Sequence, residues 1–129
     1  MILTVDVGNT RIKSAVFENG TIVEQFVFEP NELQKKIENI LKKYPNSTDL
    51  VVASVGSVSK EDFSALADVI KINFITHQYK FPFQNLYETP LTLGIDRMVL
   101  SAGAVLQFPD QNRLVIDAGT CITYDFVDQ

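Results

Sequence analysis

The first third of the chain carries short apolar runs broken by polar positions, which predicts three consecutive β-strands. The first run, 2–7, ends at a Gly-Asn pair, and the runs 11–18 and 21–28 flank Asn19-Gly20. An Asn-Gly pair favours a two-residue hairpin turn, because both residues tolerate a positive φ. We therefore expect strands over 2–7, 11–18 and 21–28, each antiparallel to the next.

The middle of the chain changes to a helical period. After Pro30 the apolar residues recur every three or four positions with Lys and Glu between them, which predicts a helix capped by Asn31. Apolar runs at 50–55 and 72–76 predict two further strands, and Ser59 marks the start of a second helix between them. The order βββαβαβ predicts a mixed α/β domain whose sheet is flanked by helices.

The last third begins with an irregular segment, 77–93. A loop of this length in a compact domain is more often functional than idle. A helical pattern over 94–107 follows, and two more strands are expected over 114–117 and 122–127. The helix that starts at Gly94 therefore comes directly after the segment in which functional residues are most expected.

Composition excludes several classes of protein. The chain has 129 residues, 46% of them apolar, which is enough for a compact core. Its net charge of −5 argues against a broad nucleic-acid-binding face. Cys121 is the only cysteine, so an intramolecular disulfide is excluded and a reducing compartment is favoured. No apolar run reaches the roughly 18 residues of a membrane helix, and the first strand lacks the basic start of a signal peptide. We expect a cytoplasmic protein that binds neither nucleic acid nor membranes.

Two segments share one design. Asp6-Val7-Gly8-Asn9-Thr10 and Asp117-Ala118-Gly119-Thr120 each place an aspartate near the end of an apolar strand, with a glycine two residues later. One copy alone is as well explained by an ordinary turn, but two copies favour a common function. The repeat predicts a duplicated domain, with the first copy in 1–112 and the beginning of the second in 113–129.

The chemistry of these segments suits a nucleotide. Glycine lets the backbone approach a phosphate closely, and successive turn N–H groups form a concavity that binds anions. The Asp6 carboxylate suits Mg²⁺, directly or through water. Lys13 lies on the same side of its strand as Arg11, so one basic side chain can reach the phosphates. Further hydrogen-bond donors are Asn9, Thr10, Thr120 and Thr123.

The segment Gly94-Ile95-Asp96-Arg97 lies where the irregular loop meets a helix. A carboxylate is favourable at a helix N-terminus on structural grounds alone. A functional interpretation makes Asp96 the base that accepts a proton from an attacking hydroxyl. Arg97 would then hold a carboxylate or stabilise charge on a phosphoryl group in transfer. The spacing is compatible with both interpretations.

Together these motifs resemble those of the type III pantothenate kinases, members of the acetate and sugar kinase/Hsp70/actin superfamily. The first motif alone indicates only the superfamily, whereas its combination with residues 94–97 is specific to this family. The resemblance implies an actin/hexokinase-like (ribonuclease H-like) fold. It runs through Asp6 to Lys13, Tyr87 to Pro90, Leu93 to Arg97 and Asp117 to Asp125.

The resemblance also implies an activity, the transfer of the ATP γ-phosphate to the terminal hydroxyl of pantothenate in the first step of coenzyme A biosynthesis. It implies ATP with Mg²⁺, a monovalent cation (K⁺ or NH₄⁺) and a homodimer. The implied ATP-binding residues are Asp6, Val7, Gly8, Asn9, Thr10, Arg11, Ile12, Lys13 and Thr120. The implied pantothenate-binding residues are Tyr87, Gly94, Ile95, Asp96 and Arg97, with Asp96 as proton acceptor. Asp117 would hold the monovalent cation, and Asp6 the Mg²⁺.

Members of this family contain two such domains, whereas these 129 residues reach only into the second. We therefore expect weak or no kinase activity from the 129 residues alone, and incomplete cover over the hairpin 114–127. Three alternatives stay open: another small-molecule kinase of the same superfamily, a non-catalytic ATP-binding regulatory protein, and an isolated structural domain. Substrate profiling separates the first, and ATP binding without turnover indicates the second.

Overall fold

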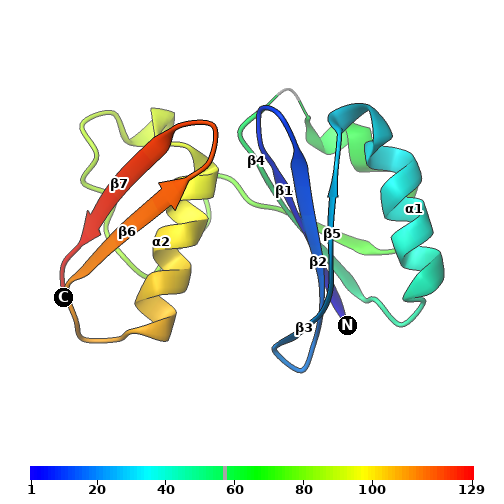
Figure 1. The fold of residues 1–129 in the computed structure, drawn as a ribbon, viewed down its shortest axis with the longest axis horizontal. Helices are drawn as coiled ribbons and strands as arrows, with labels where there is room; N and C mark the ends of the chain where they lie inside the picture. Colours follow the sequence, from blue (N-terminus) through cyan, green and yellow to red (C-terminus); the bar gives the residue numbers. More distant parts are fainter. Residues whose placement is uncertain (57) are drawn as a thin grey trace. The chain divides into compact units, whose positions relative to one another are not determined.

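The computed structural model describes residues 1–56 and 58–129, which divide into two compact units (Figure 1). Unit 1 is Met1–Ile75 and unit 2 is Thr76–Gln129. The sequence repeat predicts a different kind of boundary, after residue 112, between two duplicated domains. That domain boundary stays a prediction.

Unit 1 is built on a five-stranded mixed sheet with the strand order β3-β2-β1-β4-β5. The first three strands are antiparallel as predicted, while β4 and β5 run parallel to β1. The turn between β2 and β3 is the predicted one, with φ of 51° at Asn19 and 78° at Gly20. The strand bounds are β1 Ile2–Val7, β2 Ile12–Glu18, β3 Thr21–Phe28, β4 Asp49–Ser54 and β5 Lys71–Phe74.

The core of unit 1 lies on one face of this sheet, under the helix α1 (Leu33–Lys43) and the 3₁₀ helix η2 (Lys60–Leu66). Alternate residues of β1 and β2 point into it because successive side chains of a strand face opposite sides. Leu3 and Ile12, for example, are fully buried. The helical apolar stripe closes the core with Leu33, Ile37, Ile40 and Leu41.

Two predictions about helix starts need correction. Asn31 does not cap α1, because it lies inside a preceding 3₁₀ turn, η1 (Pro30–Glu32), whose N-cap is Glu29; the N-cap of α1 itself is Glu32. The backbone N–H of Glu29 donates to the Glu32 carboxylate at 3.2 Å. The second predicted helix does start after Ser59, but it is the 3₁₀ helix η2. Its two buried side chains, Phe63 and Leu66, are three residues apart, which matches three residues per turn.

Unit 2 consists of the short 3₁₀ helix η3 (Pro90–Thr92), the helix α2 (Ile95–Gln107) and a two-stranded antiparallel sheet. The strands are β6 (Arg113–Ala118) and β7 (Ile122–Val127). Both strands contact α2. None of the described helices is long and apolar enough to cross a membrane.

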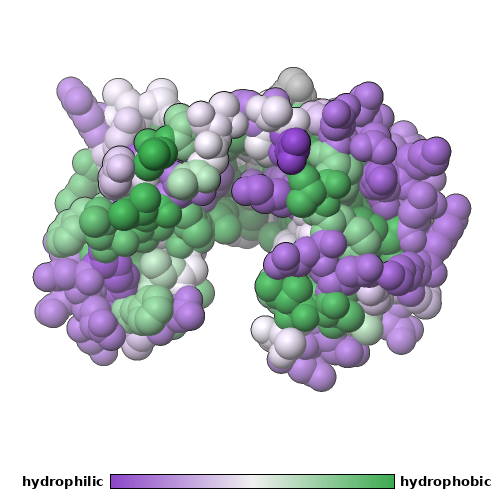
Figure 2. Space-filling view, viewed as in Figure 1, coloured by the Kyte–Doolittle hydropathy of each residue, from purple (hydrophilic) through white to green (hydrophobic). Residues whose placement is uncertain are grey.

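The sheet of unit 2 has one face that unit 2 leaves open. Every second residue of β6 and β7 is exposed, and the residues between them are buried or half-buried. Figure 2 shows hydrophobic side chains gathered over these strands. The large exposed side chains are Leu114, Ile116, Ile122, Tyr124 and Phe126, with exposures between 55% and 67%.

Candidate functional site

The loop between β1 and β2 is a tight backbone turn. The N–H of Gly8 donates to the carbonyl of Arg11 at 3.1 Å, and a Cβ at residue 8 would lie 3.1 Å from that same oxygen. Glycine therefore allows a close backbone approach that a larger residue would disturb. Asn9 and Thr10, at the tip, are exposed. The loop therefore places two exposed polar residues at the end of a buried strand.

Asp6 and Lys13 flank this loop on the two strands. Their Cα atoms are partners in the antiparallel register, so both side chains lie on the same face of the sheet. That face is opposite to the core, into which Val5 and Val7 point. The Asp6 side chain is half-buried and Lys13 is exposed. The predicted carboxylate and ammonium groups therefore stand beside the predicted phosphate-binding turn.

The second copy of the motif, between β6 and β7, forms a shorter turn. The N–H of Gly119 donates to the carbonyl of Cys121 at 3.0 Å. Asp117 is opposite Thr123 in the register. The Thr123 hydroxyl is buried and has no hydrogen-bond partner in residues 1–56 and 58–129. Two oxygen-bearing side chains thus lie on the same face here, while Thr120 is exposed at the tip.

The start of α2 is held in place by hydrogen bonds. The N–H of Met98 donates to the carbonyl of Gly94 at 3.2 Å, which begins the helix. One ring nitrogen of His77 lies 2.8 Å from the carbonyl oxygen of Leu93, the residue that precedes Gly94. Asp96 is half-buried, and its carboxylate accepts the N–H of Arg97 at 2.8 Å. A carboxylate in this first turn is also favoured by the helix dipole.

Arg97 forms a bidentate ion pair with an aspartate of β7. Its Nε and Nη2 donate to the two carboxylate oxygens of Asp125 on β7, at 2.9 and 2.5 Å. The two side chains are 22% and 17% exposed. The guanidinium also lies over the ring of Tyr87, 5.3 Å from its centroid. These hydrogen bonds from Arg97 to Asp125 raise the pKa of the guanidinium above its ordinary value, so the group stays charged.

A cavity of about 820 Å³ lies within unit 2. Its wall includes Tyr87, Arg97 and Asp125, together with the buried Ser101 and Arg113. Asp96, the predicted base, is next to Arg97 in sequence but does not line this cavity. Two of the residues that the sequence predicts for substrate binding, Tyr87 and Arg97, therefore meet at one concave surface.

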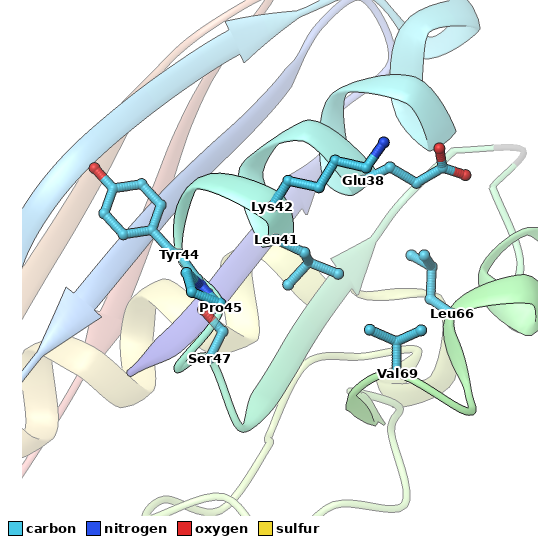
Figure 3. A pocket seen from close by; sticks show the side chains of 8 residues that line it. All are labelled: Glu38, Leu41, Lys42, Tyr44, Pro45, Ser47, Leu66 and Val69. Atoms are coloured by element: carbon cyan, nitrogen blue, oxygen red, sulfur yellow. Dashed lines mark hydrogen bonds between the residues drawn. The ribbon is translucent and has the colours of Figure 1, made fainter.

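A smaller cavity of about 300 Å³ lies in unit 1. Figure 3 shows Leu41, Leu66 and Val69 pointing toward its interior, with Glu38 and Lys42 at its edge and the ring of Tyr44 directed away. None of the residues that the sequence predicts for a site lines it. It is therefore a separate feature of the helical layer of unit 1.

The predicted site residues are divided between the two units. Asp6 to Lys13 share one loop in unit 1, whereas Tyr87, Gly94 to Arg97, Asp117 and Thr120 belong to unit 2. Among the described residues, no group of three or more His, Cys, Asp or Glu side chains could hold a metal ion by itself. The structure adds Asp125, a residue whose role the sequence motifs do not indicate. The signal for it was the alternation of β7, which turns this carboxylate to the same inward face as Thr123 and Val127.

The chain matches the model of the family described as type III pantothenate kinase over residues 2–129. It is 67% identical over 129 residues to the type III pantothenate kinase of Flavobacterium johnsoniae, and these residues are 100% of this chain and 53% of that protein. The enzyme of the same name from Flavobacterium psychrophilum is 60% identical over 129 residues, which are 100% of this chain and 54% of that protein. The chain thus spans about half the length of the curated relatives it matches.

Solved structures support the fold. A Campylobacter jejuni protein described as a member of the Baf family of transcriptional activators matches with a TM-score of 0.52 and 24% identity, over 98% of this chain and 48% of that one. A Sinorhizobium meliloti protein described as a 2-dehydro-3-deoxygalactonokinase matches with a TM-score of 0.57 and 12% identity, over 100% of this chain and 50% of that one. The predicted actin/hexokinase-like fold is confirmed, and the family match over residues 2–129 shows that this chain belongs to the type III pantothenate kinases.

Proposed function

We propose that the protein containing this chain transfers the γ-phosphoryl group of ATP to the terminal hydroxyl of pantothenate, the first step of coenzyme A biosynthesis. The observation that carries the proposal is the stacking of Arg97 on Tyr87 at the cavity of unit 2, in a member of this family. Pantothenate carries a single carboxylate, and the planar guanidinium of arginine is suited to bind that group. Gly94 and Ile95 fix the start of the helix that carries Arg97, and so complete the proposed acceptor site.

The loop 8–11 and its flanking strands are the proposed ATP site. The turn at Gly8 places the exposed residues Asn9 and Thr10 at its tip, and Lys13 adds a positive charge on the face that also carries Asp6. A phosphate chain is bound well by a combination of turn donors and one ammonium group. Thr120, on the second loop, adds a hydroxyl contact. The proposed ATP contacts are Asp6, Val7, Gly8, Asn9, Thr10, Arg11, Ile12, Lys13 and Thr120.

Asp96 is the proposed proton acceptor. The pantothenate hydroxyl oxygen attacks the γ-phosphorus, the bond from that phosphorus to the bridging oxygen breaks, and ADP leaves. The hydroxyl proton passes to the Asp96 carboxylate. Because one oxygen of that carboxylate accepts the N–H of Arg97, its orientation is fixed before a substrate arrives. The proposed base and the proposed carboxylate-binding group are thus adjacent residues at the start of α2.

The donor set fits the proposed metal ions. Asp6 offers a single carboxylate, as expected for Mg²⁺ that takes its other ligands from phosphates and water. Mg²⁺ bound with ATP would neutralise charge on the phosphates. Asp117 and the buried hydroxyl of Thr123, which has no partner among the described residues, offer two oxygens on one face, which suits a monovalent cation such as K⁺ or NH₄⁺. The family assignment supports a homodimer in the cytoplasm as the working form.

The direct test is the identity of the product. The complete gene product is incubated with ATP, Mg²⁺, K⁺ and pantothenate, and 4′-phosphopantothenate is sought by mass spectrometry, with acetate and glucose as competing acceptors. We expect product from pantothenate alone, and a loss of roughly 10²–10⁴-fold in rate for Asp96→Asn, which keeps the hydrogen bond to Arg97 but is a poor base. Phosphorylation of glucose or acetate in preference to pantothenate would assign the protein to another kinase of the superfamily.

A further inference from the structure

The contact between Arg97 and Asp125 occupies only one edge of the guanidinium. Asp125 accepts from Nε and Nη2, at 2.9 and 2.5 Å, and so binds the group side-on. A guanidinium has five N–H donors in a fixed plane. The end-on edge, formed by Nη1 and the second N–H of Nη2, is not used by Asp125. A second carboxylate can therefore bind Arg97 while the contact with Asp125 persists.

Three contacts together hold the guanidinium of Arg97 in one orientation. Asp125 holds it by two hydrogen bonds, and the Arg97 Cζ lies over the Tyr87 ring, 5.3 Å from the centroid. Asp125 and Arg97 both line the cavity of unit 2. An arginine side chain loses much rotational freedom when it is held in this way, so the loss is incurred on folding rather than on ligand binding.

The second arginine of unit 2 behaves differently. Arg113 is 8% exposed, and its donors go to the backbone carbonyls of Phe108 at 2.7 Å and Asp128 at 3.1 Å. It joins the end of α2 to the end of β7, which is a structural role. Arg97 is instead more exposed, is held by a side-chain carboxylate and stacks on a ring. The arrangement around Arg97 is what a preoriented binding group requires.

We propose that Asp125 is a positioning residue, which holds Arg97 side-on against Tyr87 so that the other edge of the guanidinium binds the carboxylate of the acceptor. This inference rests on the proposed function, because it assigns Asp125 a part in recognising the same substrate. Asp125 itself does not touch the reacting atoms. Its effect is on the affinity for an acidic acceptor and not on phosphoryl transfer as such.

The test compares an acidic acceptor with a neutral one. Pantothenol differs from pantothenate by a CH₂OH group in place of the carboxylate, so it does not need an oriented guanidinium. For Asp125→Asn in the complete gene product, we expect KM for pantothenate to rise roughly tenfold or more, the scale of one charge-assisted hydrogen bond. We expect kcat/KM for pantothenol to change less than about twofold. Asp125→Glu, which keeps the carboxylate, should recover part of the loss.

Asp68→Asn is the matched control, because it makes the same change of charge at an exposed position of unit 1 and should leave both acceptors unaffected. Thermal unfolding of each variant detects loss of fold. Equal losses for pantothenate and pantothenol would overturn the proposal and make Asp125 merely structural, as would an unchanged KM for pantothenate. If the wild-type protein phosphorylates neither acceptor, the proposed function fails and this inference fails with it.

Discussion

The two hairpins of this chain share the Asp-x-Gly pattern and have different surroundings. In each, an aspartate lies near the end of a strand, and the N–H of the following glycine donates within the turn, from Gly8 to Arg11 and from Gly119 to Cys121. The first turn is longer by one residue. Lys13 is opposite Asp6, whereas the uncharged Thr123 is opposite Asp117. The turn therefore forms by local interactions in both hairpins. The charge beside the aspartate depends on the residue opposite it on the next strand.

The sheets that carry the two hairpins differ more. The first hairpin lies in a five-stranded sheet with one face buried under α1 and η2. The second is a two-stranded sheet, with Leu114 and Ile116 on β6 more than half exposed. Burial of apolar side chains supplies most of the stability of a sheet, and an isolated two-stranded sheet is marginal. Local sequence fixes the turn, but the packing around it decides how firmly the turn is held.

The largest effect is expected when the same substitution, leucine to alanine, is made in β1 and in β6. Leu3 is 0% exposed and Leu114 is 61% exposed. In the 129-residue chain, Leu3→Ala should lower the free energy of unfolding by roughly 2–5 kcal/mol, because it leaves a cavity in the core. Leu114→Ala should change it by less than about 0.5 kcal/mol. Urea denaturation followed by circular dichroism measures both, and equal losses would mean that the two sheets are equally well covered.

The charge difference is tested next, by ATP binding. In the complete gene product, Lys13→Ala should weaken ATP binding roughly tenfold, because an ammonium group near the phosphates is lost. Thr123→Val keeps the shape of the side chain and should change ATP binding by less than about twofold. Lys35→Ala, on an exposed position of α1, is the control for a lost positive charge. Titration calorimetry gives all three affinities, and an unchanged value for Lys13→Ala would remove this residue from the ATP site.

Much of the fold can be predicted from the sequence. Asn19-Gly20 gives the hairpin turn because its backbone preference is local, and β7 starts and ends at the predicted residues 122 and 127. The Asn31 cap was wrong, because Pro30 and the Glu29–Glu32 pair formed a preceding turn that competes for the same position. Competition between two adjacent caps depends on a few hydrogen bonds and is hard to predict from pattern alone.

The candidate site was predictable only in part. Arg97 and Tyr87 were identified by their motifs, but the partner that orients Arg97 was not. Asp125 is 28 residues away in the sequence, and the contact exists only once β7 is placed against α2. Contacts between residues so far apart in the sequence depend on tertiary packing, which a local pattern of apolar and polar residues does not predict. The same holds for Arg113, whose backbone partners lie at the end of α2 and after β7.

The two glycines should respond to alanine with opposite signs. A Cβ at Gly8 would lie 3.1 Å from the Arg11 carbonyl, whereas one at Gly119 would meet nothing within 4 Å. Gly8→Ala should therefore lower the free energy of unfolding by about 1 kcal/mol, through strain in the turn. Gly119→Ala should raise it by up to about 0.4–1 kcal/mol, because alanine restricts the unfolded chain. Urea midpoints measured side by side decide this, and a shared sign would show that the turns are equally tight.

The smallest expected effect concerns the tie between β3 and α1, which is more exposed than the tie between β7 and α2. The Lys43 ammonium and the Tyr44 hydroxyl donate to Glu24, and these hydrogen bonds lower the pKa of its carboxyl below the ordinary value of 4.5. A lowered pKa in the folded state means that the carboxylate stabilises the fold above the unfolded pKa, and that this stability is lost as the pH falls through the folded value. Glu24→Gln should therefore be slightly less stable than wild type at pH 7 and equally stable at pH 3. Thermal unfolding of both proteins as a function of pH checks this. A difference in stability that does not change with pH would show that the Glu24 carboxylate does not stabilise the fold through these hydrogen bonds.

The claim that pantothenate accepts the phosphoryl group is tested most directly by the rate at which the complete gene product releases ADP from ATP. This rate is measured with and without pantothenate. A kinase that uses pantothenate as acceptor should release ADP at least about tenfold faster when pantothenate is present, since the acceptor hydroxyl is the nucleophile. Asp96→Asn should abolish the increase while ATP still binds. ATP binding with a release rate that ignores pantothenate would contradict the account, and would identify an ATP-binding protein that does not turn over.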